Sequence, residues 1–329
     1  MRSEHLRSAT VSKCKLSAQN NGGVTIVRLK QYVSIKMNHY VGRFAPSPTG
    51  KLHAGSLVAA LASYLDARAH DGEWLIRIED VDTLRCHCEF SESILEVLSR
   101  LHLYSDREVI FQSHRTERYQ AVFDHLKNIG RVYGCSCSRR EIDEADSRLG
   151  LPHGCYPGTC RSGAKGPVRS YRFRTSTGIT SFKDRRLGLF EQNVENTVGD
   201  FVVKRADELF AYQLAVVVDD HDQGVTDVVR GEDLLDNTPR QLQLYQALGW
   251  STPSYMHIPL VLNNRHEKLS KQAGARPLTD DLLKECEQAW IHLGFEPIGA
   301  DSLDAFYKTA ISCWRYRWLK EGEKNKPCL

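Results

Sequence analysis

Apolar residues recur with two alternating periods over residues 40–130, which predicts strands and helices in turn. After a strand that begins near Tyr40, the spacing of one helix face predicts a helix through Leu57, Leu61, Tyr64 and Leu65. A strand over 74–78 follows, and further helices are predicted over about 91–103 and 116–129. Strands that alternate with helices favour an α/β fold with a parallel sheet and crossover helices.

The alternation stops in the middle of the chain. Residues 134–168 hold many cysteines, glycines and prolines with little periodicity, and residues 171–182 alternate like a pair of antiparallel strands. Near-continuous apolar runs at 214–218 and 225–229 then predict strands that are covered on both faces. We therefore expect one α/β domain in two parts, 37–112 and 206–275, interrupted by an α+β insert over 113–205.

The last part of the chain, residues 276–329, is predicted to be a short helical tail. Thr279 is the predicted N-cap of a helix whose apolar side carries Leu282, Leu283, Cys286, Trp290 and Leu293. A second helix is predicted from the spacing of Leu303, Phe306, Ala310, Cys313 and Trp314. Two helices without a core of their own do not make a further domain.

Composition is that of a soluble globular protein. The 329 residues are 41% hydrophobic and 26% charged, and no apolar run approaches the length of a membrane span. The net charge of +3 is too small to prove a nucleic-acid partner and does not exclude one. Of the ten cysteines, four lie between Cys135 and Cys160, which favours a reducing, cytoplasmic compartment and one local metal site.

Residues 1–36 differ from the rest of the chain. They carry seven lysines and arginines against one acid, Glu4. Such an acid-poor composition is typical of a mitochondrial transit peptide. The alternative is that the sequence starts too far upstream, because Met37 leads directly into the first predicted strand. We favour this alternative and expect the segment to be an extension that is disordered or not native.

The stretch from Arg43 to Ser56, RFAPSPTGKLHAGS, ends where the first helix begins. A helix N-terminus exposes unpaired N–H groups and the positive end of the helix dipole, which suits a phosphate. Gly55 lets a ligand approach the backbone, and His53 can donate to phosphate oxygens. The pattern therefore predicts a phosphate site at this helix start.

A short basic loop, Lys268-Leu-Ser-Lys271, follows an apolar strand predicted over 257–262. A lysine ammonium can follow a phosphate through a reaction. Together, this loop and the RFAPSPTGKLHAGS stretch resemble the two signatures of class I aminoacyl-tRNA synthetases. The extended form of the first motif narrows the resemblance to the glutamyl/glutaminyl branch, over about residues 40–275.

Charged residues at strand ends suit an amino acid with two carboxylates. Arg43 ends the first strand and Arg230 ends the strand over 225–229, and a guanidinium bonds both oxygens of a carboxylate. Glu79 is placed to take an ammonium, and Tyr212 supplies a hydroxyl. Arg43, Arg230 and Glu79 lie at the carboxyl ends of predicted strands, where parallel sheets bind ligands.

The resemblance implies a Rossmann-like class I synthetase catalytic domain that activates L-glutamate with ATP and Mg²⁺. The implied catalytic residues are His53, Gly55, Ser56, Lys268, Ser270 and Lys271, of which His53, Gly55 and Lys271 contact ATP. The implied glutamate contacts are Arg43, Phe44, Ala45, Pro46, Ser47, Glu79, Tyr212 and Arg230. The family's strand-end cluster matches Asp219, Asp220 and His221, whose role stays open between a ribose contact, a structural contact and chemistry.

Short cysteine spacing inside an irregular loop is typical of structural zinc. Cys135 and Cys137 are followed by Cys155-Tyr156 and Cys160. Glutamyl-queuosine tRNA(Asp) synthetases carry a similar C-x-C and Y-x-x-x-C pattern, and this resemblance implies one zinc held by Cys135, Cys137, Tyr156 and Cys160. Cys155, directly before Tyr156, is the alternative fourth ligand.

Two departures from the general signatures also resemble that truncated group. The first motif ends in Ser56, and the lysine loop carries Leu269 and Gln272. No anticodon-binding region follows the lysine loop in this sequence. The expected function is therefore glutamate activation and transfer to the queuosine base in the anticodon of tRNA(Asp), by a monomer without a membrane segment. A compact glutamyl-tRNA synthetase and an inactive tRNA-binding paralogue are the alternatives.

Overall fold

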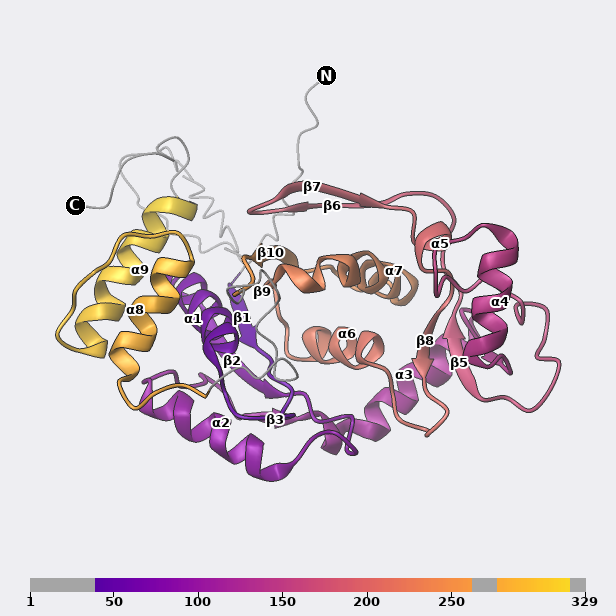
Figure 1. Cartoon of the computed structure of the whole chain (residues 1–329), viewed down its shortest axis with the longest axis horizontal. Helices are drawn as coiled ribbons and strands as arrows, with labels where there is room; N and C mark the ends of the chain where they lie inside the picture. The colour runs from indigo at the N-terminus through magenta and orange to yellow at the C-terminus, as the bar shows by residue number, and fades with distance from the viewer. Residues whose placement is uncertain (1–38, 262–276, 320–329) are drawn as a thin grey trace, which may run out of the picture. The chain divides into compact units, whose positions relative to one another are not determined.

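The computed structural model describes residues 39–261 and 277–319, and those from Tyr40 onward belong to one compact unit (Figure 1). The predicted extension over 1–36 lies outside the described residues. So does the lysine loop with Lys268, Ser270 and Lys271.

Two mostly parallel sheets form the centre of this unit. The first has the order β1–β2–β3, with β1 at Val41–Phe44, β2 at Glu73–Ile78 and β3 at Ile110–Phe111. The second has the order β7–β6–β10–β9, with β6 at Thr180–Asp184, β7 at Gly188–Gln192, β9 at Asp227–Gly231 and β10 at Ser254–Ile258. Their edges meet where the Thr226 amide donates to the Val41 carbonyl oxygen at 2.9 Å. The predicted α/β fold with parallel strands is confirmed.

The crossover helices follow the predicted order. They are α1 (Ala54–Ala69), α2 (Cys88–Arg100), the 3₁₀ turn η1 (Gln112–Arg115) and α3 (Thr116–Asn128). In α1, Leu57, Leu61 and Leu65 are fully buried in the main hydrophobic core, as the apolar spacing predicted. Burial of this stripe fixes α1 against β1 and β9, and so places its N-terminus at the carboxyl end of β1.

The predicted strand over 214–218 is wrong. These residues lie in α6 (Tyr212–Asp222), which precedes β9, the turn η2 (Glu232–Asn237) and α7 (Thr238–Leu248). Eight of the eleven residues of α6 are buried, against α3 and α7 among others. A helix that is covered nearly all round has the same continuous apolar run as a buried strand, so the pattern could not separate the two.

The predicted antiparallel pair over 171–182 is also wrong, because its two strands join different sheets. Strand β5 (Ser170–Phe173) pairs antiparallel with β4 (Val132–Cys135) and β8 (Phe201–Lys204). Strand β6 instead runs parallel to β10. The helices α4 (Arg139–Leu149) and α5 (Val194–Thr197) lie near the β4–β5–β8 sheet (Figure 1). Within residues 113–205, the β6–β7 hairpin thus returns to the sheet of β9 and β10.

Both predicted C-terminal helices are present, as α8 (Leu282–His292) and α9 (Leu303–Leu319). The N-cap of α8 is Asp281, whose carboxylate accepts from the Lys284 amide, and not the predicted Thr279. Both helices pack on α1 and extend the main core. Among the described helices, none has the length and hydropathy that a bilayer span requires.

Candidate functional site

The loop between β1 and α1 lines a cleft of about 410 Å³. From this loop and the first turns of α1 come Phe44, Ala45, Pro46, Ser47, Thr49, His53, Gly55, Ser56 and Ala59. The opposite walls are Gly231, Asp233 and Leu234, at and after the end of β9, and residues 258–261, at and after the end of β10. The cleft therefore lies at the carboxyl ends of three strands, where the sequence predicted a ligand site.

His53 is the N-cap of α1, and its side chain is tied to the first turn. Its Nδ1 accepts from the Ser56 amide at 3.3 Å, and its Nε2 lies 3.1 Å from the Ser56 hydroxyl. The first turn of α1 contains no acidic residue. The positive end of the helix dipole and the His53–Ser56 pair thus face the cleft together, which suits an anionic ligand.

Arg230 is a buried cation on β9, with 4% of its surface exposed. Its Nε donates to Nε2 of His257 at 3.2 Å, and its Nη2 donates to the Thr238 hydroxyl at 2.7 Å. Its Nη1 is buried and has no hydrogen-bond partner among the described residues. A buried guanidinium nitrogen without a partner is costly, so this atom is suited to receive an anionic group from a ligand.

Tyr212 begins α6 and lies close to the predicted glutamate-binding charges. Burial raises the pKa of its hydroxyl, and the charges of Arg230, Glu79 and Arg43 all act on it. Four residues predicted to bind glutamate therefore lie close enough together for their charges to interact: Tyr212, Arg230, Glu79 and Arg43.

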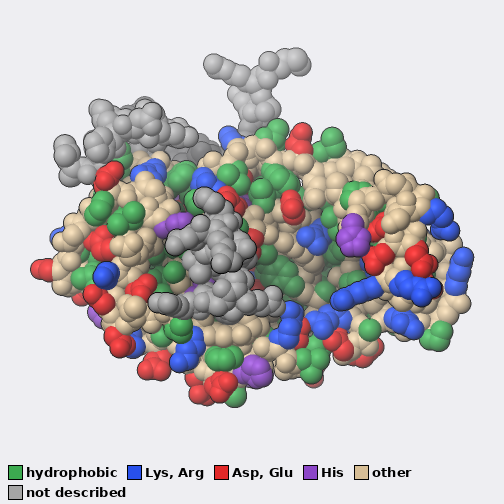
Figure 2. All heavy atoms as spheres, in the orientation of Figure 1, with side chains coloured by type: hydrophobic (Ala, Val, Ile, Leu, Met, Phe, Trp, Pro, Cys, Tyr) green, Lys and Arg blue, Asp and Glu red, His purple; other side chains and the backbone are tan. Residues whose placement is uncertain are grey.

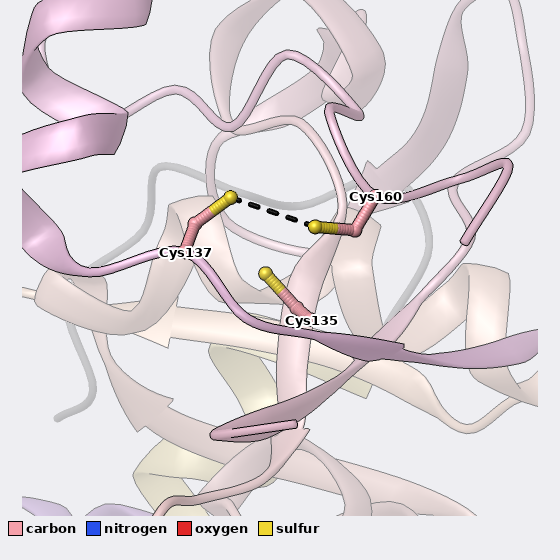
Figure 3. A group of neighbouring side chains, drawn as sticks. All are labelled: Cys135, Cys137 and Cys160. Atoms are coloured by element: carbon pink, nitrogen blue, oxygen red, sulfur yellow. Dashed lines mark hydrogen bonds between the residues drawn. The ribbon is translucent and has the colours of Figure 1, made fainter. Parts of the chain in front are cut away.

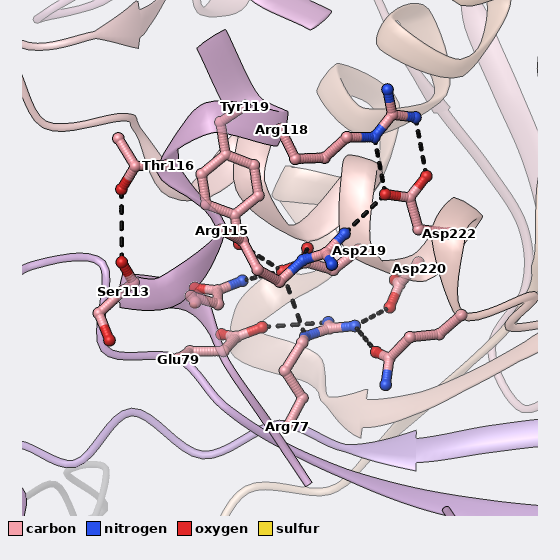
Figure 4. Close-up of polar contacts among 12 residues, drawn as sticks. Arg77, Glu79, Ser113, Arg115, Thr116, Arg118, Tyr119, Asp219, Asp220 and Asp222 are labelled. Atoms are coloured by element: carbon pink, nitrogen blue, oxygen red, sulfur yellow. Dashed lines mark hydrogen bonds and ion pairs between the residues drawn. The ribbon is translucent and has the colours of Figure 1, made fainter. Parts of the chain in front are cut away.

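A buried charge cluster joins Arg77 of β2 and Glu79, directly after β2, to Asp220 of α6 (Figure 4), and Arg43 of β1 also contacts Asp220. Arg77, with no exposed surface, donates to Asp220 at 2.7 Å and to Glu79 at 3.2 Å. Asp220 also accepts from Nε and Nη2 of Arg43, at 3.1 and 3.4 Å. Burial raises the pKa of Glu79, although Arg77 and Arg43 oppose the rise. The two predicted substrate residues Arg43 and Glu79 are thus held in place by Asp220 and Arg77.

Arg77 was missed in the sequence, although a signal was present. Arg77 and Glu79 are two residues apart, and alternation along β2 places such residues on one face of the sheet. The partner that makes Arg77 important, Asp220, is 143 positions away. Only the fold brings them together.

The structure gives Asp219 and His221 contacts on two sides of α6. Asp219 accepts from Gln112 at 2.7 Å, from Arg115 at 2.6 Å and from Tyr119 at 2.8 Å, so it joins α6 to η1 and α3. The His221 ring stacks on Trp250 at a centroid distance of 3.8 Å. These contacts favour a structural role for both residues over a role in chemistry.

The thiols of Cys135, Cys137 and Cys160 lie within 4.8 Å of one another (Figure 3). The Tyr156 hydroxyl is 3.3 Å from the Cys135 sulfur and 3.8 Å from the Cys137 sulfur. The Cys155 thiol points elsewhere, toward the carbonyl oxygens of Glu195 and Asn196 at 3.7 and 3.6 Å. Three thiol sulfurs and one phenol oxygen thus lie close together, and such a set of donor atoms suits a zinc ion.

Comparison with known proteins identifies the family. Residues 40–290 match the model of the catalytic domain of class I tRNA synthetases (E and Q). The chain belongs to this class I tRNA synthetase family. The match spans both halves of the cleft, the cysteine cluster and most of α8.

Two relatives of this synthetase chain are named glutamyl-Q tRNA(Asp) synthetase. The protein of Janthinobacterium sp. (strain Marseille) is 49% identical over 299 residues, covering 86% of this chain and 99% of the relative. The protein of Albidiferax ferrireducens is 53% identical over 304 residues, covering 84% of this chain and 98% of the relative.

A solved structure shares the fold. A glutamate tRNA ligase from Elizabethkingia meningosepticum, in complex with its amino acid, is 26% identical with a TM-score of 0.66. The alignment covers 82% of this chain but only 64% of that ligase. This chain thus spans less than two thirds of the length of that ligase.

Proposed function

We propose that this synthetase activates L-glutamate with ATP and transfers the glutamate to the queuosine base in the anticodon of tRNA(Asp). One observation carries the proposal: relatives named glutamyl-Q tRNA(Asp) synthetase align with this chain over 98–99% of their own length at about half identity. Arg230, whose buried Nη1 has no hydrogen-bond partner among the described residues, lies close to Tyr212 and supports an acidic amino acid as the substrate.

The activation step is an attack of the glutamate α-carboxylate on the α-phosphorus of ATP. A carboxylate oxygen–phosphorus bond forms, the bond to the β-phosphate bridging oxygen breaks, and pyrophosphate leaves. Negative charge grows on the phosphate oxygens, so positioning and electrostatic stabilisation carry the catalysis. The α1 N-terminus, His53 and Ser56 supply donors for those oxygens, and Mg²⁺ accompanies ATP.

Glutamate presents two carboxylates and one ammonium to the pocket. Arg230 offers Nη1 to a carboxylate, and the Glu79 carboxylate is held by Arg77 where an ammonium would meet it. Arg43, the Phe44–Ser47 segment and Tyr212 complete the predicted contact set. A bound ammonium would lower the raised pKa of Glu79 and keep its carboxylate charged.

Lys268, Ser270 and Lys271 complete the proposed catalytic set from the lysine loop. Lys271 would stabilise the charge that develops on the phosphates. Lys271→Ala should therefore slow glutamate-dependent ATP–pyrophosphate exchange far more than it weakens glutamate binding. Unchanged exchange in this variant would refute the role.

We also propose that the β4–β5–β8 sheet with α4 and α5, within residues 113–205, forms a subdomain with one structural zinc held by Cys135, Cys137, Tyr156 and Cys160. Their mutual distances fit a single ion, whereas Cys155 faces the carbonyl oxygens of Glu195 and Asn196. A bound zinc would link the end of β4 to the irregular loop over 150–169, which contains no helix or strand of its own.

Exposed basic side chains on this subdomain support an RNA partner. Figure 2 shows lysines and arginines along the edge where α4 lies, interspersed with acids. Within residues 139–169, the exposed lysines and arginines are Arg139, Arg140, Arg148, Lys165 and Arg169. Positive charges of this kind contact phosphates and position an RNA without reading its sequence.

A single experiment separates the proposed acceptor from the tRNA 3′ end, which the similarity to a glutamate tRNA ligase makes the second candidate. The protein is incubated with ATP, labelled glutamate and tRNA(Asp) with or without queuosine. Label should appear only on queuosine-containing tRNA and should map to that nucleoside after nuclease digestion. A label on the 3′-terminal adenosine would support the second candidate instead.

A further inference from the structure

Asp184, His257 and Arg230 form a row of buried, hydrogen-bonded side chains on three neighbouring strands. Asp184 ends β6, His257 lies in β10 and Arg230 lies in β9, where His257 and Arg230 are direct partners in the parallel register. Asp184 is 1% exposed and His257 is fully buried. Of these three, only Arg230 was predicted from the sequence to be functional.

Hydrogen bonds determine where the proton of His257 lies. Asp184 Oδ2 is 2.7 Å from His257 Nδ1 and also accepts the His257 backbone amide at 2.9 Å. Asp184 Oδ1 accepts the backbone amides of Arg186 and Leu187 at 2.9 and 2.8 Å. The hydrogen bonds from His257 and these amides outweigh burial and hold the pKa of Asp184 below its ordinary value. An ionised Asp184 can only accept, so Nδ1 of His257 carries a proton.

The other ring nitrogen of His257 must accept. Nε2 of His257 lies 3.2 Å from Nε of Arg230, and an arginine Nε can only donate. The Thr238 hydroxyl accepts from Nη2 of Arg230 at 2.7 Å and lies 3.2 Å from Nε2 of His257, to which it can donate its own proton. Burial, the largest influence, lowers the pKa of His257. Neutral His257 with its proton on Nδ1 is the one state that satisfies all these contacts.

Because His257 is neutral, it accepts a hydrogen bond from Arg230 without neutralising its charge, which a carboxylate would do. Among the described residues, no carboxylate forms an ion pair with Arg230. Nε and Nη2 of Arg230 are fixed by His257, Thr238 and the Leu234 carbonyl oxygen, the last at 3.4 Å. The positive charge is thus oriented without being neutralised, and Nη1 is left for a ligand.

We propose that His257 is a positioning residue for the substrate: fixed by Asp184, it holds Arg230 so that Nη1 meets a carboxylate of the amino acid. The inference rests on the proposed function, in which that amino acid is glutamate. Thr238 assists from the start of α7. Preorganisation of this kind lowers the cost of ordering a charged side chain when the substrate binds.

Two amide substitutions of His257 separate its two hydrogen bonds. In His257→Asn the amide can replace Nδ1 and keep the contact with Asp184, but it leaves Nε of Arg230 without its acceptor. In His257→Gln the longer side chain brings its oxygen toward the place of Nε2 and can restore that acceptor. Both variants place a polar amide in the same buried site, so each is the folding control for the other.

The readout is the Michaelis constant for glutamate and for ATP in pyrophosphate exchange. His257→Asn should raise KM for glutamate about tenfold to a hundredfold, the usual effect of losing a hydrogen bond to a charged group. His257→Gln should stay within about threefold of the wild type, and KM for ATP should change little in either variant. Equal effects of the two variants, or parallel rises in both constants, would overturn the inference.

A second measurement does not depend on activity. In protein with ¹⁵N-labelled histidine, the signal that disappears in His257→Gln should be that of a neutral ring protonated on Nδ1. A proton on Nε2, or a charged ring at neutral pH, would overturn the inference even if the wild type is active. A wild type that exchanges no pyrophosphate with glutamate would instead reject the proposed function, while the spectrum still decides the state of His257.

Discussion

Removal of Arg77 should destabilise the protein through the charges that it leaves behind. Arg77 compensates Asp220 and Glu79 at 2.7 and 3.2 Å and lies 3.8 Å from Asp219, all in a site with almost no exposed surface. Arg77→Met keeps most of the aliphatic stem and removes only the guanidinium. Loss of one partner of a buried ion pair costs about 3–5 kcal/mol of unfolding free energy. Because Arg43 still contacts Asp220, we expect about 3 kcal/mol, at the lower end.

The effect should depend on pH with a defined sign. Burial would raise the pKa of Asp220, but Arg43 and Arg77 outweigh it and hold this pKa below its ordinary value. The ionised Asp220 therefore contributes stability above its unfolded pKa of about 3.9. That contribution is lost as pH falls through the lower folded pKa. Without Arg77 the folded pKa of Asp220 rises, and protonation then relieves the uncompensated charge. The deficit of Arg77→Met should therefore be largest near neutral pH and shrink toward a pH of about 4–5.

Equilibrium unfolding in urea measures this deficit, followed by circular dichroism and tryptophan fluorescence at both pH values. The matched control is Arg140→Met, which removes an exposed i,i+4 pair with Glu144 on α4 and should change the midpoint little. A deficit of equal size at both pH values would show that Arg77 acts by packing, and the charge argument would fail.

Two further predictions concern the cysteine cluster and the C-terminal helix. Purified Cys160→Ser should lose the zinc that Cys155→Ser retains, because Cys160 lies with the other two thiols and Cys155 does not. The zinc content of both proteins is measured by atomic absorption. The reverse result would contradict the proposed ligand set. Trp314→Phe removes an indole hydrogen bond of 2.9 Å to the buried carboxylate of Asp66 and should cost about 1.5–3 kcal/mol in urea unfolding. The control Trp290→Phe loses an equally long bond to a neutral carbonyl oxygen and should cost less, so equal losses would refute a charge-assisted contact.

Local sequence determined the elements whose signals are local. The apolar stripe of α1 and the His53 cap lie within a few residues of each other, so the helix start at which we predict phosphate binding was readable directly. The order of β1, α1, β2, α2 and α3 was correct for the same reason, whereas the two-residue strand β3 and the turn η1 between α2 and α3 were missed. The resemblance also gave the family, because the RFAPSPTGKLHAGS and KLSK motifs are short and specific.

Tertiary structure decided what depends on distant partners. The apolar run of α6 fits a buried strand as well as a buried helix, and only its packing against α3 and α7 separates them. Likewise, β5 and β6 are neighbours in sequence but pair in different sheets.

The candidate site shows the same division. Sequence identified Arg230, Glu79 and Arg43 by their places at strand ends, because the ends of parallel strands meet at one edge of a sheet. It could not show that Arg77 and Asp220 hold two of them, or that Asp184 and His257 hold the third. Apart from Arg77 with Glu79, those contacts join residues 27 to 177 positions apart, and their energy depends on burial that no local pattern encodes. The sequence determined which charged side chains are present at the strand ends. The fold determined which of them are neutralised by buried partners and which can still meet a substrate.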